Sequence, residues 1–215
     1  MTGAKRGRGR PVGPGVDVAQ RRTDLLDAAE AVIRDVGPDA GLADVARQAG
    51  FGRSAVYAVF PNRAALLAAL SERQAHRLLA EITKKASGST DLRQRMMLFF
   101  DVICAWMHDE PNLYRAMSAH AVGDHEVSTI FDELAGAVES MLAASLRATG
   151  ADVSAAAPWA RAIVGSATVT AEWWIRCSTM PRHQLVEHLT ALCWDGGAAL
   201  PFSPFDVAAI DTQQP

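Results

Sequence analysis

The chain has 215 residues, of which 49% are hydrophobic and 21% are charged, which suits a globular fold and excludes a wholly disordered chain. Its formal net charge is −3, and as a bulk figure this argues against a nucleic-acid partner. Residues 1–22, however, carry six Lys and Arg against one Asp, whereas residues 64–215 carry eleven basic and seventeen acidic residues. This asymmetry predicts a polyanionic partner for the basic end of the chain.

Membrane-spanning and secreted proteins are not favoured. The longest apolar stretch, residues 96–107, is interrupted by Asp101 and is too short to cross a bilayer. The basic N-terminus is followed by Gly, Pro and Asp and not by the apolar core of a secretory signal. Cys104, Cys177 and Cys193 lie far apart, which is typical of free thiols in a reducing compartment. We therefore expect a cytoplasmic protein.

Residues 1–20 consist mainly of Gly, Pro and Arg and are predicted to form a disordered basic arm. Arg8 and Arg10 belong to an Arg-Gly-Arg-Pro sequence that is similar to the core of an AT-hook. Glycine lets such a backbone lie flat in a narrow minor groove, where arginines meet an enhanced negative potential. The alternative is a generic basic tail that attracts DNA of any sequence.

Helical periodicity follows the arm. We predict a first helix from Arg22 to a Gly-Pro break at residues 37–38, a second over 42–49 and a third from about Arg53. Pro61 stands where a first-turn proline is tolerated and is expected to open a long fourth helix.

The rest of the chain also has helical periodicity, and no segment shows the alternation typical of a strand. Helices are expected to begin at Asp91 and Pro111 and to span residues 126–149, 154–179 and 181–200. The predicted fold class is therefore all-α, with about nine helices.

Residues 42–60, LADVARQAGFGRSAVYAVF, read as two short helices joined by a tight turn that contains Gly50. Each helix has enough apolar surface to pack on the other and on the first helix, which is the helix-turn-helix design. In this design the second helix enters the major groove of DNA. The residues of that helix that we expect to face DNA are Arg53, Ser54, Ala55 and Tyr57.

Each of these side chains suits a particular group on DNA. Arg53 has the shape to bind O6 and N7 of guanine, Ser54 reaches a base or a phosphate, and Ala55 fits a thymine methyl group. Tyr57 suits a phosphate oxygen. A two-helix pattern is weak support by itself, because any small helical bundle supplies one.

From Arg22 to about Ile82 the chain resembles the tetracycline-repressor (TetR/AcrR) family of transcriptional regulators. The resemblance rests on the sequences LLDAAEAVIRDVG, DVARQAG, a third helix ending in VY..F, and PNRAALLAAL. Gly50, Tyr57 and Phe60 fall in register with the family pattern. Beyond this region the chain matches the family in length and helical character.

Three positions depart from the family pattern. Gly41 and Gly52 stand where the family usually has Thr or Ser caps, and a glycine cap costs only about a few tenths of a kcal/mol. Val59 replaces a polar aromatic residue or His, which removes one expected phosphate contact.

The resemblance implies a dimeric DNA-binding regulator, a repressor, that a small ligand releases from a palindromic operator. It also implies that Arg22 and Thr23, at the start of the first helix, bind phosphates on one side of the third helix. Asn62 and Arg63, at the start of the fourth helix, would bind phosphates on the other side. The alternative is that Arg53, Asn62 and Arg63 are ordinary solvated surface.

Family members typically pair through their last two long helices, so the resemblance implies a homodimer built on apolar stripes there. The alternative is that these stripes belong to the core of one subunit. The residues of the expected interface are Trp159, Ile163, Ala167, Trp174, Leu185, Leu189, Leu192 and Gly196.

The resemblance further implies a pocket for a small effector among the middle helices. Methionine and aromatic side chains line adaptable apolar cavities, although the same residues also form ordinary cores. No basic cluster in this half favours a polyanionic effector, so an apolar or amphipathic one is expected. The candidate pocket residues are Phe99, Phe100, Ile103, Met107, Tyr114, Met117, Phe131 and Trp173.

An enzyme is not favoured. His120 and His125, with Asp124 and Glu126, form the only acid–histidine cluster, and a five-residue separation does not place two histidines on one helical face. Nucleophile-elbow, phosphate-loop and dinucleotide motifs are absent, so we expect no catalytic residue, metal or cofactor. Two alternatives remain: a DNA-binding or architectural protein without an effector, and a helical enzyme or carrier whose helix-turn-helix is incidental.

The predicted organisation has four parts. A disordered arm (1–20) precedes a DNA-binding head (21–82), in which residues 41–60 form the helix-turn-helix. A helical effector-binding and dimerisation body (83–200) follows, and the chain ends in a loose tail (201–215).

Overall fold

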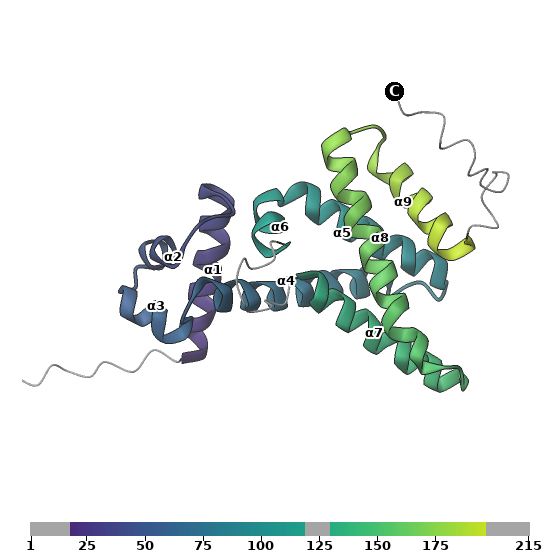
Figure 1. Cartoon of the computed structure of the whole chain (residues 1–215), viewed down its shortest axis with the longest axis horizontal. Helices are drawn as coiled ribbons and strands as arrows, with labels where there is room; N and C mark the ends of the chain where they lie inside the picture. The colour runs from purple at the N-terminus through teal and green to yellow at the C-terminus, as the bar shows by residue number, and fades with distance from the viewer. Residues whose placement is uncertain (1–17, 119–129, 197–215) are drawn as a thin grey trace, which may run out of the picture.

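The computed structural model describes residues 18–118 and 130–196, and within these two ranges the chain forms nine α-helices and no strand. The prediction of an all-α fold is therefore confirmed. The head lies at one end of the molecule, and the long helix α4 runs from it into the body (Figure 1). The helices of the head and the connecting helix are α1 (Val18–Val36), α2 (Leu42–Ala49), α3 (Arg53–Val59) and α4 (Arg63–Ala86).

The body contains five helices, and three of them, α5, α6 and α7, pack against α4. Helices α7 and α8 lie side by side, and α5 packs against α4, α8 and α9 (Figure 1). No helix in the described ranges has the length and apolar content needed to cross a membrane. The helices of the body are α5 (Leu92–Asp109), α6 (Pro111–Ser118), α7 (Ile130–Thr149), α8 (Ala156–Cys177) and α9 (Arg182–Thr190).

The starts of the second, third, fifth and sixth helices agree with the sequence-based prediction, whereas α8 begins at Ala156, α9 ends at Thr190, and two helix starts in the head differ as well. Helix α1 begins at Val18, four residues before Arg22, so the end of the predicted arm is helical. Helix α4 begins at Arg63 and not at Pro61, because Asn62 caps it: Asn62 Oδ1 accepts a hydrogen bond from the Ala65 N–H at 2.8 Å.

Some predicted features lie outside the described residues. These are Arg8 and Arg10 of the arm, the histidines at 120 and 125, and the tail at 201–215.

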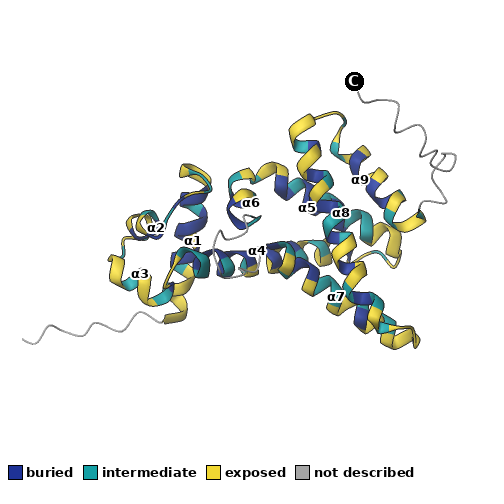
Figure 2. Ribbon diagram, viewed as in Figure 1, coloured by how far each residue is buried: buried dark blue, intermediate teal, exposed yellow. Residues whose placement is uncertain are grey.

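One continuous apolar core extends through the head and the body (Figure 2). In the head, Val56 and Phe60 are fully buried beneath the helix-turn-helix, as the sequence predicts. In the body, Phe100, Ile103 and Met107 of α5 are fully buried as well. Because the core is shared, the head and the body form one packed unit around α4.

A buried carboxylate joins α1 to α4. Glu30 of α1 is only 8% exposed and accepts hydrogen bonds from Arg73 and Arg77 of α4, the latter at 2.7 and 2.9 Å. Arg73 also pairs with Asp27 at 2.6 Å. We refer to Asp27, Glu30, Arg73 and Arg77 as the Glu30 cluster, and it orients α1 on the connecting helix.

The far end of α1 is held by the body. Arg34 donates to both carboxylate oxygens of Glu110 at 2.9 and 3.1 Å, and Asn112 Nδ2 donates to the Arg34 carbonyl at 3.0 Å. Glu110 and Asn112 lie at the corner between α5 and α6. Glu110 and, to a smaller extent, Glu30 raise the pKa of Arg34. The head is thus attached to the body through α4 and through the end of α1.

Helix α2 has no capping side chain at Gly41, and Asp44 compensates from within the helix. Asp44 Oδ2 accepts the Gly41 N–H at 3.0 Å, and Oδ1 accepts from Arg47 at 2.6 Å. The hydrogen bond from Gly41, aided by the charge of Arg47, lowers the pKa of Asp44. The ionised carboxylate therefore stabilises the first turn of the helix-turn-helix.

We expect Asp44→Asn to lower the melting temperature at pH 7. Because the pKa of Asp44 is lower in the folded state than in the unfolded state, its contribution is complete above the unfolded value of about 3.9 and is lost as the pH falls through the folded value. Thermal melts of both proteins between pH 7 and pH 3 check this. A difference that stayed constant over that range would contradict it.

Candidate functional site

Helix α3 lies at the outer end of the head, away from the body (Figure 1). Its side chains divide into two faces: Val56 is buried, whereas Arg53, Ser54 and Tyr57 are exposed, with Tyr57 at 51%. Ala55 is partly buried at the edge between these faces. The structure therefore brings together the four α3 residues that the sequence predicts for DNA binding, on an unobstructed surface.

The turn between α2 and α3 requires a glycine. Gly50 adopts the left-handed conformation with φ 67°, and the next N–H, of Phe51, donates to the Ala46 carbonyl at 3.1 Å. A side chain at this position would strain the backbone. The turn fixes the angle at which α3 leaves α2 and so presents its polar face outward.

Two arginines near the start of α1 stack on aromatic rings that flank α3. The guanidinium of Arg22 lies 5.0 Å from the centre of the Phe60 ring, and that of Arg21 lies 6.0 Å from the Phe51 ring. The sequence predicts a DNA contact for Arg22 but does not single out Arg21. The partners are some thirty residues apart, so no local pattern identifies the Arg21–Phe51 contact.

Two side chains that are expected to bind phosphates donate hydrogen bonds to backbone carbonyls within the head. Thr23 lies in the second turn of α1, because the helix begins at Val18, and its hydroxyl donates to the Ala19 carbonyl at 3.1 Å. Arg63 donates to the carbonyls of Pro38 and Ala40, the latter at 3.2 Å. Arg63 thus fastens α4 to the loop before α2, and Asn62 remains exposed at the α4 N-terminus.

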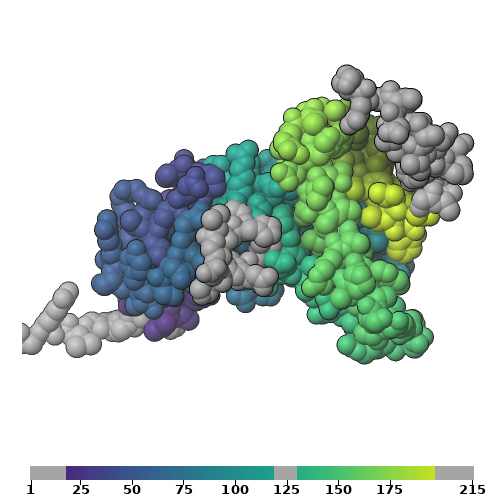
Figure 3. Space-filling model, viewed as in Figure 1, coloured from purple at the N-terminus to yellow at the C-terminus, as the bar shows by residue number. Residues whose placement is uncertain are grey.

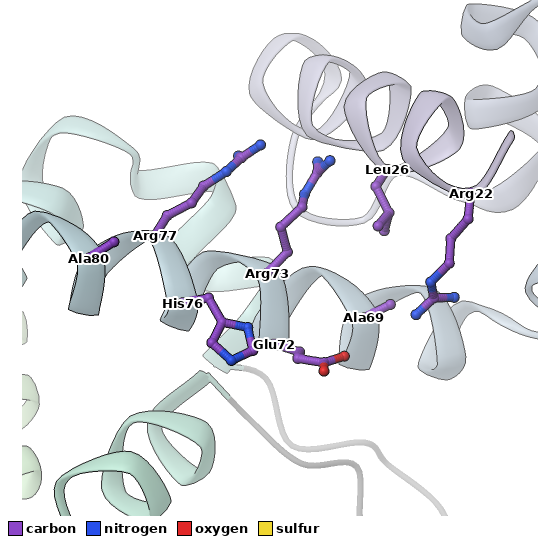
Figure 4. A pocket seen from close by; sticks show the side chains of 8 residues that line it. All are labelled: Arg22, Leu26, Ala69, Glu72, Arg73, His76, Arg77 and Ala80. Atoms are coloured by element: carbon purple, nitrogen blue, oxygen red, sulfur yellow. The ribbon is translucent and has the colours of Figure 1, made fainter. Parts of the chain in front are cut away.

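A groove of about 400 Å³ runs between α1 and α4, and the sequence does not predict it (Figure 4). Arg73 reaches from α4 toward α1, whereas His76 and Glu72 point away from α1. The charges of Arg73 and Arg77 are compensated by the carboxylates of Asp27 and Glu30. The groove is therefore a surface feature of the head and is separate from the predicted effector pocket.

Most of the predicted pocket residues form the interior of the body. Phe99 and Phe100 pack edge to face with ring centres 5.7 Å apart, and Tyr114 lies 6.1 Å from Phe131. The buried members of the set are Phe99, Phe100, Ile103, Met107 and Met117. Trp173 does not belong to this interior, contrary to the prediction. It is 39% exposed on the outer face of α8, because its neighbour Trp174 occupies the inward position.

The expected dimer interface also needs correction. Helices α5, α8 and α9 bury four of its members inside the subunit: Ala167, Trp174, Leu185 and Leu189. The Trp174 indole N–H donates to the Met180 carbonyl at 2.6 Å and its ring lies 5.3 Å from that of His108. These four residues therefore belong to the core of one subunit, which was the alternative to a dimer interface. Ile163 and Gly196 are partly buried, and Trp159 and Leu192 are exposed.

A different stripe on α8 faces outward. Its members recur at alternating steps of three and four residues, and the large ones are well exposed: Val169 at 69%, Trp159 at 52% and Trp173 at 39%. Helix α8 runs across one face of the body without being covered by another helix (Figure 3). The stripe, named the α8 seam below, consists of Trp159, Ala162, Ser166, Val169 and Trp173.

No group of three or more His, Cys, Asp or Glu residues in the described part of the chain is placed to hold a metal ion. Cys104 is fully buried, and this burial raises the pKa of its thiol to about 12. A thiol with so high a pKa is not a thiolate at neutral pH.

Two family models match the chain and together cover most of it. Residues 25–70 match the model of bacterial regulatory proteins of the tetR family, and residues 83–201 match that of the tetracyclin repressor-like C-terminal domain. The first match contains the helix-turn-helix, and the second contains all of the body helices.

Two known proteins similar in sequence are HTH-type transcriptional regulators. The HTH-type transcriptional repressor LfrR of Mycolicibacterium smegmatis is 31% identical over 84% of this chain and 92% of its own. An uncharacterized HTH-type transcriptional regulator of Mycobacterium tuberculosis is 23% identical over 81% of this chain and 76% of its own.

Solved structures with the same fold are more distant in sequence. FadR of Thermus thermophilus, a TetR-family repressor in complex with lauroyl-CoA, has a TM-score of 0.65 at 17% identity over 86% of this chain and 98% of that one. A tetR-family regulator of Streptomyces coelicolor has a TM-score of 0.64 at 20% identity over 83% and 80% of the two chains.

Proposed function

The chain belongs to the tetR family of bacterial regulatory proteins and is a DNA-binding transcriptional regulator, and we propose that it acts in the cytoplasm as a dimeric repressor that a small ligand releases from a palindromic operator. The observation that carries the proposal is the polar face of α3, exposed at the free end of a head fixed to the body. The name of the relative in Mycolicibacterium smegmatis supports repression.

The arrangement of the head suggests how it binds DNA. Arg53, Ser54 and Tyr57 would enter the major groove on α3, and Arg22, which stacks on Phe60, would bind the phosphate backbone. Two heads read two half-sites if their α3 helices lie one turn of DNA apart, about 34–36 Å. The half-site spacing is then set by how two bodies associate.

The α8 seam is the surface that we propose for dimerisation. Its three- and four-residue steps match the spacing by which paired helices interlock, and its exposed Trp and Val side chains are costly to leave in water. Leu192, 48% exposed beyond α9, extends the apolar surface. A two-fold axis across the seam would pair α8 with its copy.

The effector would act by selecting one geometry of this dimer. A ligand that binds one body conformation more tightly shifts the equilibrium by its difference in affinity for the two conformations. Helix α4 passes from the body core into the head, so a change around its far half moves α3. The lauroyl-CoA bound to the fold neighbour from Thermus thermophilus is consistent with a partly apolar effector.

A second candidate is a regulator that responds to no small ligand. The full burial of Phe100, Ile103 and Met107 favours it, because these residues fill the interior where the pocket is expected. Screening apolar ligands for both a thermal shift and release of DNA separates the two candidates. Stabilisation accompanied by release supports the ligand-responsive repressor.

Selection of bound DNA from a random pool tests the proposed function. We expect a palindromic consensus whose half-sites are separated by one turn of DNA. Failure to enrich any sequence at low salt would contradict sequence-specific binding. Enrichment of a single, unrepeated half-site would contradict the dimer.

The same selection tests the role of Arg53. Arg53→Ala is expected to weaken operator binding by about 1–3 kcal/mol per half-site and to relax base preference at one position in each half-site, because a bidentate contact to guanine is lost. A uniform loss across all sequences, with the consensus unchanged, would instead make Arg53 a phosphate contact.

A further inference from the structure

Few contacts hold helix α3 on the head. It has seven residues, of which only Val56 is buried, and among the described helices α2 alone packs on it over several residues. No side chain caps its N-terminus, because Gly52 stands there. The direction in which α3 points therefore depends on the contacts made at its two ends.

An aromatic residue stands at each end of α3. Phe51 directly precedes the N-cap Gly52, and Phe60 is the C-cap. The guanidinium of Arg21, on α1, lies 6.0 Å from the centre of the Phe51 ring. The guanidinium of the next residue, Arg22, lies 5.0 Å from the centre of the Phe60 ring. Two neighbouring side chains of α1 thus contact both ends of α3.

The contact with Phe51 is what holds Arg21 in place. In the described part of the chain no carboxylate pairs with the guanidinium of Arg21, and its Nε–H is shielded from water without a hydrogen bond. A shielded donor without a partner is costly, so the stacking on the ring must offset this cost. Arg22 differs, because its side chain is exposed and suits a phosphate as well.

We propose that Arg21 and Phe51 form a positioning contact that sets the tilt of α3 in the major groove, so that both residues determine base specificity without touching a base. The seven residues of α3 span about 10 Å, so a shift of about 1 Å at the Phe51 end would tilt the helix by about 6°. Such a shift moves Arg53, in the first turn, away from the base that it would read. The inference rests on the proposed binding of α3 to DNA.

Two DNA duplexes test the proposal. One carries the consensus that the wild-type protein selects from a random pool, and the other has the same length and composition in scrambled order. Arg21→Met is expected to lower the ratio of the two affinities, consensus over scrambled, about tenfold. The lost positive charge also weakens binding to the scrambled duplex, so the ratio is the quantity that reports positioning. Anisotropy titrations at one salt concentration measure both affinities.

Variants of Phe51 test whether the two residues act together. Phe51→Leu removes the ring but keeps an apolar side chain, and it should lower the ratio as much as Arg21→Met does. The double variant should lower it no further, because either change breaks the same contact. Phe51→Tyr keeps the face of the ring and should retain the wild-type ratio. If Phe51→Leu does not fold, Arg21→Met decides, since Arg21 is not part of the apolar core.

Arg47→Met is the matched control for Arg21→Met. Arg47 is another arginine of the head, on α2, and its side chain is 76% exposed and pairs with Asp44. Its replacement removes the same charge from the head. It should therefore weaken binding to both duplexes equally and leave the ratio unchanged.

The outcomes separate this inference from the proposed function. A wild-type ratio in Arg21→Met, or the same loss of ratio in Arg47→Met, would overturn the positioning role. Additive losses in the double variant would overturn it as well, because Arg21 and Phe51 would then act separately. A wild-type protein that prefers no sequence would contradict the proposed function, and the inference with it.

Discussion

Replacing Glu30 by alanine is expected to lower the free energy of unfolding by about 3 kcal/mol, since removing one partner of a buried ion pair leaves the other charge uncompensated. Glu30 is 8% exposed, and Arg73, which would keep only the exposed Asp27 as a partner, is 17% exposed. Urea denaturation of the two proteins measures the difference. The same change should weaken operator binding, because Glu30 sets the angle of α1 on α4.

Asp27→Ala provides the control for Glu30→Ala. Asp27 pairs with the same arginine but is 60% exposed, so its removal should cost less than about 1 kcal/mol. Glu30→Gln keeps the volume of the side chain and separates the loss of charge from the loss of packing. Equal, small effects for all three variants would show that the Glu30 cluster does not hold the head.

Val169→Glu is expected to convert the proposed dimer to a monomer and to weaken operator binding by about a hundredfold or more. The substitution places two negative charges near the two-fold axis of the α8 seam, and a monomer loses the advantage of binding two linked half-sites. Sedimentation analysis measures the oligomeric state, and titration with the selected operator measures the affinity.

Val36→Glu is the matched control for Val169→Glu. Val36 is 66% exposed and Val169 is 69% exposed, so both variants replace a surface valine by glutamate, but Val36 lies at the end of α1 in the head. It should leave the oligomeric state unchanged. A Val169→Glu protein that remained dimeric with wild-type affinity would exclude the seam as the interface.

The head could be predicted in detail because its determinants are local in sequence. The glycine turn, the inward Val56 and Phe60, and the polar α3 face each follow from residues within one helix or turn. What could not be predicted are contacts between distant segments. The Arg63 hydrogen bond to the Pro38 carbonyl joins residues 25 positions apart, and it gives Arg63 a structural role that the sequence does not indicate.

The body shows more clearly what helical periodicity in the sequence cannot predict. A 3.6-residue repeat predicts that α8 has an apolar face, but α8 is apolar on two faces, and the sequence does not say which one its own subunit covers. The predicted dimer interface included Ala167 and Trp174, which pack inward. Val169 and Trp173, on the other face, are exposed. Only the positions of α5, α7 and α9 distinguish the two faces.

The sequence also did not indicate the role of Glu30, because that role depends on residues that are distant in the chain. Glu30 looks like a helical surface residue until Arg73 and Arg77 are brought over it.

The docking of Arg34 on Glu110 and Asn112 limits the way in which the head can move. A rigid body that is free to turn about a single attachment has three rotational degrees of freedom, whereas one held at two points retains only the rotation about the line that joins them. The head is held where α4 enters the body and where α1 meets the α5–α6 corner. Any rearrangement that keeps both attachments therefore carries α3 along one arc, so the two half-sites of an operator would be gained or lost through a single coordinate.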